Sequence, residues 1–474
     1  MEKFNVKCKV EKNERSYVIA DDNIEAGEEI LLENPILITP NWDSEIRCSN
    51  CFRESNIVCK KCDVFPMCVA CEDHDSFDCE FFQKAVGFSK NLLIENFSVF
   101  GPLKCLMLLE NPEKSTVASE ILKLPSFTSE RRNSDIWEEH EKNVVGPLMQ
   151  SGLPSLLKTV KVDSELIQKI CGIIDGNSFE IRNSSGDSVK GIYPFANNLT
   201  HNCTPNTMMA VGFDLKMKII STIPIEKGSL VQNCYVSPLV GTGVRQHLLK
   251  NGKYITCNCD RCEDPTEFGT FMSSLICRAC FESYLINKNS AWICISCSCE
   301  MPTTEVNEIL IDANNDILDA DGDIRQMEYL IQKFSKMFHP NHYLIIDLKQ
   351  SVASILRSIC TASLVPPGKA VMDRKIQLCE EILPVLKVIQ PGISRLNAIA
   401  MYEYFVPLVE VAEIDFEEKV IGKEKYLEIL TEAEKLAKES ARMLLYEPVN
   451  SPEGDLAQQV MQHVKKIRNR ISKI

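Results

Sequence analysis

The residues with the clearest chemical meaning in this sequence are its cysteines. The chain has 22 cysteines in 474 residues, and fifteen of them fall in spacings that metal coordination explains well. The opening MEKFNVKCKV has no signal-peptide core, and no apolar run is long enough to cross a membrane. We therefore expect a protein of the nucleus or cytoplasm, where thiols stay reduced and grouped cysteines serve metals or catalysis rather than disulfides.

The first group of ligands lies within residues 48–79. It contains three Cys-x2-Cys pairs, one histidine and one further cysteine, and too little apolar material for a core of its own. Eight ligands suit two tetrahedral zinc ions. In an interleaved arrangement the first and third pairs hold one ion, and the second pair holds the other together with the histidine and the last cysteine. The ligands are Cys48, Cys51, Cys59, Cys62, Cys68, Cys71, His74 and Cys79.

Two more groups follow later in the chain. Cys257-x-Cys259-x2-Cys262 supplies three ligands, so a fourth must come from elsewhere, and the resemblance of the run 199–206 to a known family motif makes Cys203 the best candidate. The last group has the two-knuckle spacing of a zinc ribbon. Its ligands are Cys277, Cys280, Cys294 and Cys297. We therefore predict about four zinc ions, all structural, because closed four-ligand sites leave no position open for catalysis.

The pattern of apolar residues places these groups among other elements. Short β-prone runs fill the start of the chain and residues 176–256, while helical spacing fills 84–175 and everything after about 304. The prediction is an α+β protein with a β-rich core, three zinc-bound modules and a helical C-terminal part. The predicted segments are 1–45, 46–80, 81–175, 176–256, 257–303 and 304–474.

The net charge of −14 limits the partners. An acidic chain neutralises phosphates poorly, so direct nucleic-acid binding is not expected. The basic run at the C-terminus is typical of cationic side chains that interact favourably with the last carbonyls of a helix. Its members are Lys465, Lys466, Arg468, Arg470 and Lys473. We expect no membrane contact and a monomer.

Several motifs in fixed order make the chain recognisable. After the first cysteine group come Asn177-Ser178-Phe179, Tyr193-Pro194, the run 199–206 (LTHNCTPN) and then the 257–262 group. In this order they resemble the SET- and MYND-domain (SMYD-type) protein-lysine methyltransferases. The resemblance covers nearly the whole chain, and DPTEFGT at 264–270 with the extra ribbon looks like the arthropod branch. It implies a SET domain interrupted by a MYND zinc finger (46–80) and a tetratricopeptide-like helical domain (304–474).

The resemblance also implies roles for single residues. Phe179 matches a wall of the substrate-lysine channel, and Tyr235 matches the catalytic tyrosine that follows the last SET strand and also borders the cofactor. Arg15, His201 and Asn206 match positions around the cofactor, S-adenosylmethionine. Such a channel favours methyl transfer because it positions the amine and, by desolvation, disfavours its protonated form.

The chain departs from the family pattern at three points. The cofactor loop, normally Gly-Arg-Gly, is Glu14-Arg15-Ser16, and side chains there obstruct a close backbone approach. The amide that opens the Asn-His-Ser-Cys motif is Thr200. Many relatives have a second active-site tyrosine at the position of Lys253, whereas here the tyrosine, Tyr254, comes one residue later. We expect this segment to be a strand, and on a strand a shift of one residue points the side chain to the opposite face of the sheet.

Two functional hypotheses lead. The first is a lysine methyltransferase that uses S-adenosylmethionine on a protein substrate, with a histone as one candidate, in transcriptional regulation. The alternative is a catalytically weak SET scaffold that recruits protein partners, with the MYND finger gripping a proline-rich peptide. A simple zinc-stapled structural protein ranks last, because it leaves the run 199–206, Phe179 and Tyr235 without a role.

Overall fold

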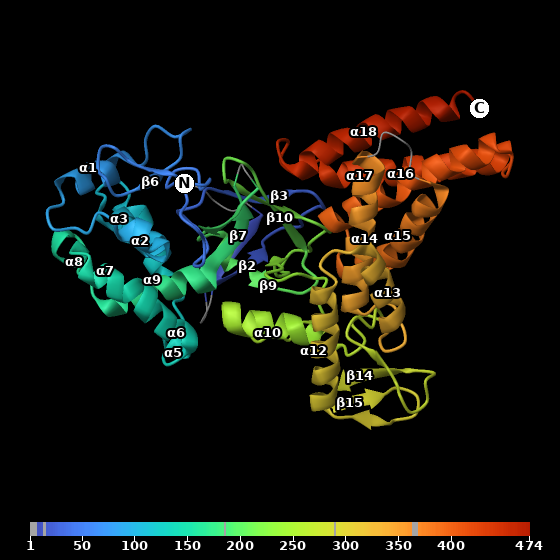
Figure 1. The fold of residues 1–474 in the computed structure, drawn as a ribbon, viewed down its shortest axis with the longest axis horizontal. Coiled ribbons are helices and arrows are strands. Elements are labelled where there is room, and N and C mark those ends of the chain that lie inside the picture. The colour runs from blue at the N-terminus through green and yellow to red at the C-terminus, as the bar shows by residue number, and fades with distance from the viewer. Residues whose placement is uncertain (1–6, 13–15, 184–185, 289–290, 363–367) are drawn as a thin grey trace.

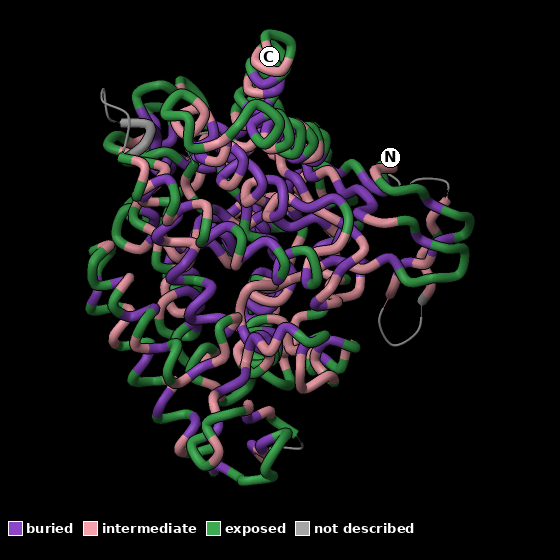
Figure 2. The backbone as a smooth tube through the Cα atoms, turned by 90° about the vertical axis from the view of Figure 1, so that its right-hand side faces the viewer, coloured by how far each residue is buried: buried purple, intermediate pink, exposed green. Residues whose placement is uncertain are grey.

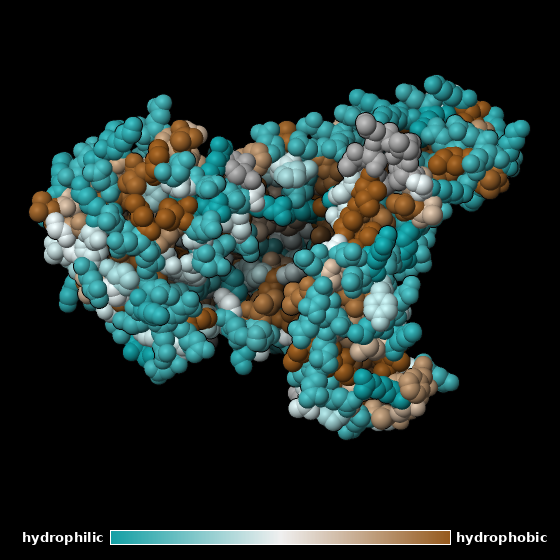
Figure 3. Space-filling model, viewed as in Figure 1, coloured by the Kyte–Doolittle hydropathy of each residue, from teal (hydrophilic) through white to brown (hydrophobic). Residues whose placement is uncertain are grey.

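The computed structural model describes residues 7–12, 16–183, 186–288, 291–362 and 368–474. It confirms a mixed α+β fold, with a β-rich N-terminal region that carries four Cys/His clusters and a helical C-terminal bundle. In Figure 1 the short strands occupy the middle, the helical insert lies to the left and the C-terminal helices stand to the right. The space-filling view is hollowed between these two helical parts, and hydrophilic residues cover most of this face (Figure 3).

The β-rich region consists of several small sheets rather than one large sheet. In the strands Ser16–Ala20 and Leu37–Thr39 alternate residues are buried, so each of these lends one face to the core. Strands β1 (Cys8–Lys12) and β2 (Ser16–Ala20) form an antiparallel hairpin. The order of the second sheet is β10 (Thr207–Val211), β11 (Met217–Ser221) and β3 (Glu29–Glu33). The order of the third is β4 (Leu37–Thr39), β8 (Ser188–Ile192) and β7 (Ser178–Arg182).

One short parallel pair brings the sequence motifs together. Strand β9 (Thr200–His201) pairs with β12 (Gln232–Asn233), so that His201 lies opposite Asn233. Backbone bonds from Val231 N to Val18 O and from Ala20 N to Ser229 O fix the segment before β12 against β2. The run 199–206 and the Asn-Cys-Tyr motif therefore meet at one place in the fold.

The helical insert packs mainly through α9 (Ser164–Asn177). Its N-cap is Asp163, whose side chain accepts a hydrogen bond from Leu166 N, and its residues at three- and four-residue spacing, such as Ile167, Ile170 and Ile174, are buried. The smaller elements are α1 (Ser76–Lys84), α2 (Leu92–Glu95), η1 (Phe97–Val99), α3 (Phe100–Glu110), α4 (Ser115–Ala118), η2 (Ile121–Lys123), α5 (Thr128–Arg131), α6 (Asp135–His140), the π-helical η3 (Glu141–Val145), α7 (Gly146–Gln150) and α8 (Leu153–Leu156).

The segment before the second zinc group corrects the sequence-based expectation. Lys253 is the last residue of helix α10 (Thr242–Lys253), and Tyr254 is its left-handed C-cap with φ of 54°. The expected strand at this position is therefore wrong, because the chain leaves a helix here and turns towards the cysteines. Beyond it lie α11 (Asp260–Glu263) and the ribbon strands β13 (Leu275–Ile276), β14 (Tyr284–Lys288), β15 (Ala291–Cys294) and β16 (Glu300–Met301).

The C-terminal helices form an array in which helices α13 to α18 each pack on the next. Figure 2 shows buried backbone running through the interior and exposed residues along the outside. The array joins the β region at Gly392, whose neighbour Ile393 donates from N to Thr222 O over 2.9 Å. Among the described residues, no helix has the length and apolarity to span a membrane. The helices are α12 (Thr303–Asp319), α13 (Ile324–Phe334), α14 (Tyr343–Ala362), α15 (Lys369–Ile389), α16 (Arg395–Glu417), α17 (Lys423–Leu444) and α18 (Pro452–Ile471).

Candidate metal centres and active site

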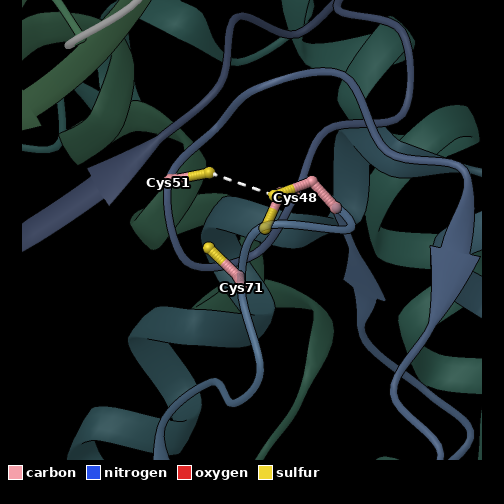
Figure 4. Close-up of side chains that lie close together, drawn as sticks. Cys48, Cys51 and Cys71 are labelled. Atoms are coloured by element: carbon pink, nitrogen blue, oxygen red, sulfur yellow. Dashed lines mark hydrogen bonds between the residues drawn. The ribbon is translucent and has the colours of Figure 1, made fainter.

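The first cysteine group forms two four-ligand clusters in the predicted interleaved pairing. In each cluster the ligand atoms all lie within 4.8 Å of one another, and they are Cys48, Cys51, Cys68 and Cys71 in one and Cys59, Cys62, His74 and Cys79 in the other. The paired strands β5 (Ile57–Val58) and β6 (Pro66–Met67) lie beside the loops that carry the cysteine pairs, and α1 supplies Cys79. Figure 4 shows the sulfur atoms of Cys48, Cys51 and Cys71 pointing towards one another.

The distances within these clusters fit zinc. With Zn–S bonds near 2.3 Å, the edge of a tetrahedron is about 3.8 Å. The Sγ atoms of Cys51 and Cys68 are 3.6 Å apart, and those of Cys59 and Cys79 are 3.9 Å apart. Nε2 of His74 lies 3.4 Å from Cys62 Sγ, and burial lowers the pKa of His74 to about 4, so the ring is a neutral ligand at pH 7.

The other two clusters have the same geometry. Cys203 joins Cys257, Cys259 and Cys262, with Sγ–Sγ distances of 3.9 Å to Cys257 and 3.5 Å to Cys262. In the ribbon, Cys277 and Cys297 are 3.6 Å apart and Cys280 and Cys294 are 3.8 Å apart. All sixteen predicted ligands are thus brought together in four sets consistent with zinc sites. Four protein ligands at each site indicate structural metal.

A buried ion cluster beside the Cys203 site was not anticipated from the sequence. Glu267 Oε2 accepts from Arg245 NH1 (2.8 Å) and Arg261 NH2 (2.9 Å), and its Oε1 accepts from Ser273 Oγ. The side chains of both arginines are 0% exposed and that of Glu267 is 1% exposed. Arg245 also points a donor at Cys262 Sγ, 3.8 Å away. No local pattern in the sequence marked this cluster, because Arg245, Arg261 and Glu267 come from separate segments.

The predicted catalytic residues lie together near the β9–β12 pair. The ring of Phe179, from β7, is 6.0 Å from the rings of both Tyr193 and Tyr235, edge to face in each case. The Tyr235 hydroxyl donates to the backbone oxygen of Leu199. Burial raises the pKa of Tyr235 well above that of a free phenol. The result is an aromatic wall in which Phe179 and Tyr193 are buried, Tyr235 is half-buried, and both phenols donate to backbone oxygens, Tyr193 to that of Leu215.

His201 touches this wall on one side and a metal ligand on the other. Its Nδ1 accepts from Tyr235 N over 3.1 Å, so the neutral ring carries its proton on Nε2, which lies 3.3 Å from Cys203 Sγ. Burial lowers the pKa of His201 to about 4 and keeps the ring uncharged. Both nitrogens are occupied, and His201 therefore holds the tyrosine next to the metal cluster.

The predicted cofactor residues are placed unequally. The side-chain amide of Asn206 hydrogen-bonds to the backbone: it donates to Leu230 O and accepts from Gln232 N, each at 2.8 Å. Arg15 and Glu14 lie outside the described residues. The cofactor roles of Arg15, His201, Asn206 and Tyr235 remain predictions.

Two buried polar atoms near the β9–β12 pair have no hydrogen-bond partner in the structure. They are Oγ1 of Thr200 and Nδ2 of Asn233. Buried polar atoms are nearly always paired, so this pair indicates a place where a polar ligand would complete the bonding. Asn233 was not singled out from the sequence, although it precedes Tyr235 in the same motif, and only the parallel register brings it opposite His201.

The described cavities lie elsewhere. One of about 970 Å³ lies among α13, α14 and α15, and one of about 480 Å³ lies between the insert and strand β8. Neither is lined by Phe179, His201, Asn206 or Tyr235. Next to the aromatic wall, Lys253 instead donates from Nζ to Ser178 O over 2.6 Å.

Comparisons with known proteins agree with the motif order. The chain is 26% identical over 402 residues to the SET domain-containing protein SmydA-8, isoform B, of Drosophila melanogaster, which covers 79% of this chain and 85% of that protein. It is 34% identical over 89 residues to the histone-lysine N-methyltransferase SET5 of Candida glabrata, covering 19% of this chain and 16% of that protein. No family model matches.

Among solved structures, the SET domain of LSMT bound to lysine and AdoHcy aligns with 99% of this chain and 89% of its own, at 11% identity and a TM-score of 0.33. Similarity at that level carries no argument about this chain. The match to SmydA-8 does carry one, because it covers 79% of this chain and 85% of that protein. This chain is a SET-domain protein of the SMYD-type methyltransferase family, related to SmydA-8 of Drosophila.

Proposed function

We propose that this protein is a protein-lysine methyltransferase that uses S-adenosylmethionine. The observation that carries the proposal is the aromatic cluster of Phe179, Tyr193 and Tyr235 next to the β9–β12 pair. Membership of the SET-domain methyltransferase family supports it. An aromatic wall that carries phenol groups suits the reaction, because the amine must be positioned and must lose its proton.

The residues near the β9–β12 pair also fit the cofactor. Thr200 Oγ1 and Asn233 Nδ2 are the unpaired buried atoms that its polar groups would satisfy. When bound, S-adenosylmethionine supplies a methyl group on a positively charged sulfur. The aromatic rings of Phe179 and Tyr235 would hold this charge favourably through their negative faces.

Tyr235 orients the acceptor and does not remove its proton. Because its hydroxyl proton points to Leu199 O, the lone pairs of the phenol oxygen remain to accept a hydrogen bond from an amine. Burial raises the phenol pKa, so Tyr235 stays protonated and is no general base. The aromatic wall partly desolvates an amine beside it and thereby disfavours a charged ammonium.

The substrate class follows from the chemistry and the relatives. A lysine in a protein segment is the acceptor, and a histone tail is the first one to test, because two SET5 relatives of similar local identity are named histone-lysine methyltransferases. A role in transcriptional regulation follows if the histone is the substrate. The zinc clusters are structural in this proposal.

The test is calorimetric titration of the zinc-loaded protein with S-adenosylmethionine and S-adenosylhomocysteine, followed by methyl transfer to histone peptides. We expect micromolar binding, and loss of transfer in Tyr235→Phe with binding retained. Tyr329→Phe, at a ring that is 63% exposed, is the matched control and should behave as wild type. Absence of binding of either ligand would refute the methyltransferase proposal.

A second candidate is a SET scaffold that binds partners and has little activity. One observation favours it: the amine of Lys253 hydrogen-bonds to Ser178 O, directly before the wall residue Phe179. In this case the finger would bind a proline-rich peptide, and exposed apolar residues such as Val69 (80%) and Ile57 (42%) offer contact area. A labelled proline-rich peptide should then bind wild type and Tyr235→Phe equally but not Cys68→Ala, in which the finger loses a zinc ligand.

A further inference from the structure

Lys253 is a lysine that hydrogen-bonds to the residue directly before the predicted catalytic Phe179. It ends helix α10, which Figure 1 shows between the insert and the C-terminal helices. Its Nζ donates to the backbone oxygen of Ser178 over 2.6 Å. Among the described residues, no salt bridge joins this ammonium to a carboxylate. A long charged side chain is thus turned inwards without an opposite charge in contact.

The carbonyl that holds the amine belongs to the aromatic wall. Ser178 directly precedes Phe179, whose ring meets that of Tyr235 at 6.0 Å. On the other side, Tyr254 stacks on Phe127 with ring centroids 4.6 Å apart, and both residues have positive φ. Large side chains rarely adopt this conformation. The strained turn therefore fixes the direction in which the neighbouring Lys253 leaves the backbone.

The surroundings of Lys253 disfavour the ammonium form. Burial is the main cause, and the charge of Lys190 adds repulsion. These two effects outweigh the attraction of Asp175 and lower the pKa of Lys253 to about 8. Lys190 extends over the Trp42 ring, and Asp175 Oδ1 accepts from Trp42 Nε1, so both charges are anchored by the same side chain. An amine with such a pKa presents a lone pair in a substantial fraction of molecules near pH 8.

We propose that Lys253 is a methyl-acceptor site within the protein itself, its amine taking the place beside Phe179 and Tyr235 that a substrate lysine would take. This rests on the proposed methyltransferase function. The lone pair of neutral Nζ forms a bond to the methyl carbon of S-adenosylmethionine. The carbon–sulfur bond breaks, and its electron pair stays on sulfur as an uncharged thioether. The proton that the ammonium gives up beforehand goes to water.

The main experiment is peptide mass spectrometry of the zinc-loaded, full-length protein after incubation with S-adenosylmethionine. We expect methyl incorporation at Lys253 with a rate that does not change when the protein is diluted, because the reaction is intramolecular. Lys253→Met should lose this incorporation, and Tyr235→Phe should lose it while still binding the cofactor by calorimetry. Lys250→Arg, at an exposed lysine of the same helix, is the matched control and should leave it unchanged.

A second readout needs no cofactor. Labelling of amines by acetic anhydride at graded pH, mapped by peptide mass spectrometry, should show Lys253 becoming reactive around pH 8. Complete protection of Lys253 across that range would overturn the proposal. If the protein binds cofactor and methylates a peptide but carries no methyl group at Lys253, this proposal is overturned and the proposed function stands. Absence of cofactor binding would overturn both, and incorporation that scales with protein concentration would overturn the intramolecular site.

Discussion

Glu267→Gln tests the buried ion cluster beside the Cys203 metal site. The substitution keeps the shape of the side chain but removes the negative charge that faces Arg245 and Arg261. The new amide also turns a donor towards one of the guanidinium groups or towards Ser273 Oγ. Since both arginine side chains are 0% exposed, neither can reach water without unpacking the loop. We expect a large loss of stability.

The magnitude follows from the burial. Removing one partner of a buried ion pair costs about 3–5 kcal/mol, because the remaining charge is left uncompensated. Here one carboxylate serves two arginines, so the upper part of that range applies. For modules of 150–250 residues each kcal/mol lowers the unfolding midpoint by ~2–4 °C, so about 4–5 kcal/mol gives a decrease of roughly 8–20 °C. The Met272 sulfur, which Arg261 NH2 contacts at 3.2 Å, is too weak an acceptor to replace the charge.

The assay is thermal and urea unfolding followed by circular dichroism, with zinc content measured on the same samples. Glu263→Gln, at an exposed carboxylate of α11, is the matched control and should change stability by about 0.5 kcal/mol or less. If Glu267→Gln were as stable as this control, the reasoning would be refuted. Neutralisation of the arginines would then come from the zinc-bound thiolates near Arg245 and not from Glu267.

Three further predictions concern other parts of the molecule. Cys68→Ala should lower the zinc content, measured by atomic emission, by one ion per chain, whereas Cys299→Ser, outside the four ligand sets, should leave it unchanged. Equal zinc contents in the two variants would contradict the ligand assignment. Gly392→Ala should cost at least about 2 kcal/mol in urea unfolding, because φ is +76° and a Cβ would lie 2.1 Å from Thr222 O, while Gly422→Ala, in open space, should be nearly neutral. Burial lowers the pKa of His342 from 6.5 to about 3. Between pH 6.5 and 5 the unfolded chain therefore takes up a proton that the folded chain does not, and the free energy of unfolding falls by up to about 2 kcal/mol. His342→Phe should remove that part of the acid loss, and an unchanged pH dependence would disprove it.

The sequence by itself determined the four metal clusters, the α+β class and the family. Ligand pairs two residues apart bring their sulfur atoms close whatever surrounds them, and the scarcity of apolar residues in 46–80 leaves metal as the means of folding that segment. The order of the motifs carried the family resemblance, because it depends on chain connectivity and not on packing. The domain boundaries and the roles of Arg15, Phe179, His201, Asn206 and Tyr235 remain predictions.

Only the tertiary structure decided what the long-range contacts do. A parallel pair of two-residue strands places Asn233 opposite His201, and no local pattern announces such a pairing. The predicted strand at Lys253 is a helix end, because the tight αL turn at Tyr254 depends on stacking against Phe127 from the distant insert. The cluster of Glu267 with Arg245 and Arg261 likewise joins three elements. Metal ligands are set by spacing along the chain, whereas buried charges and unpaired polar atoms depend on which distant segments fold against each other.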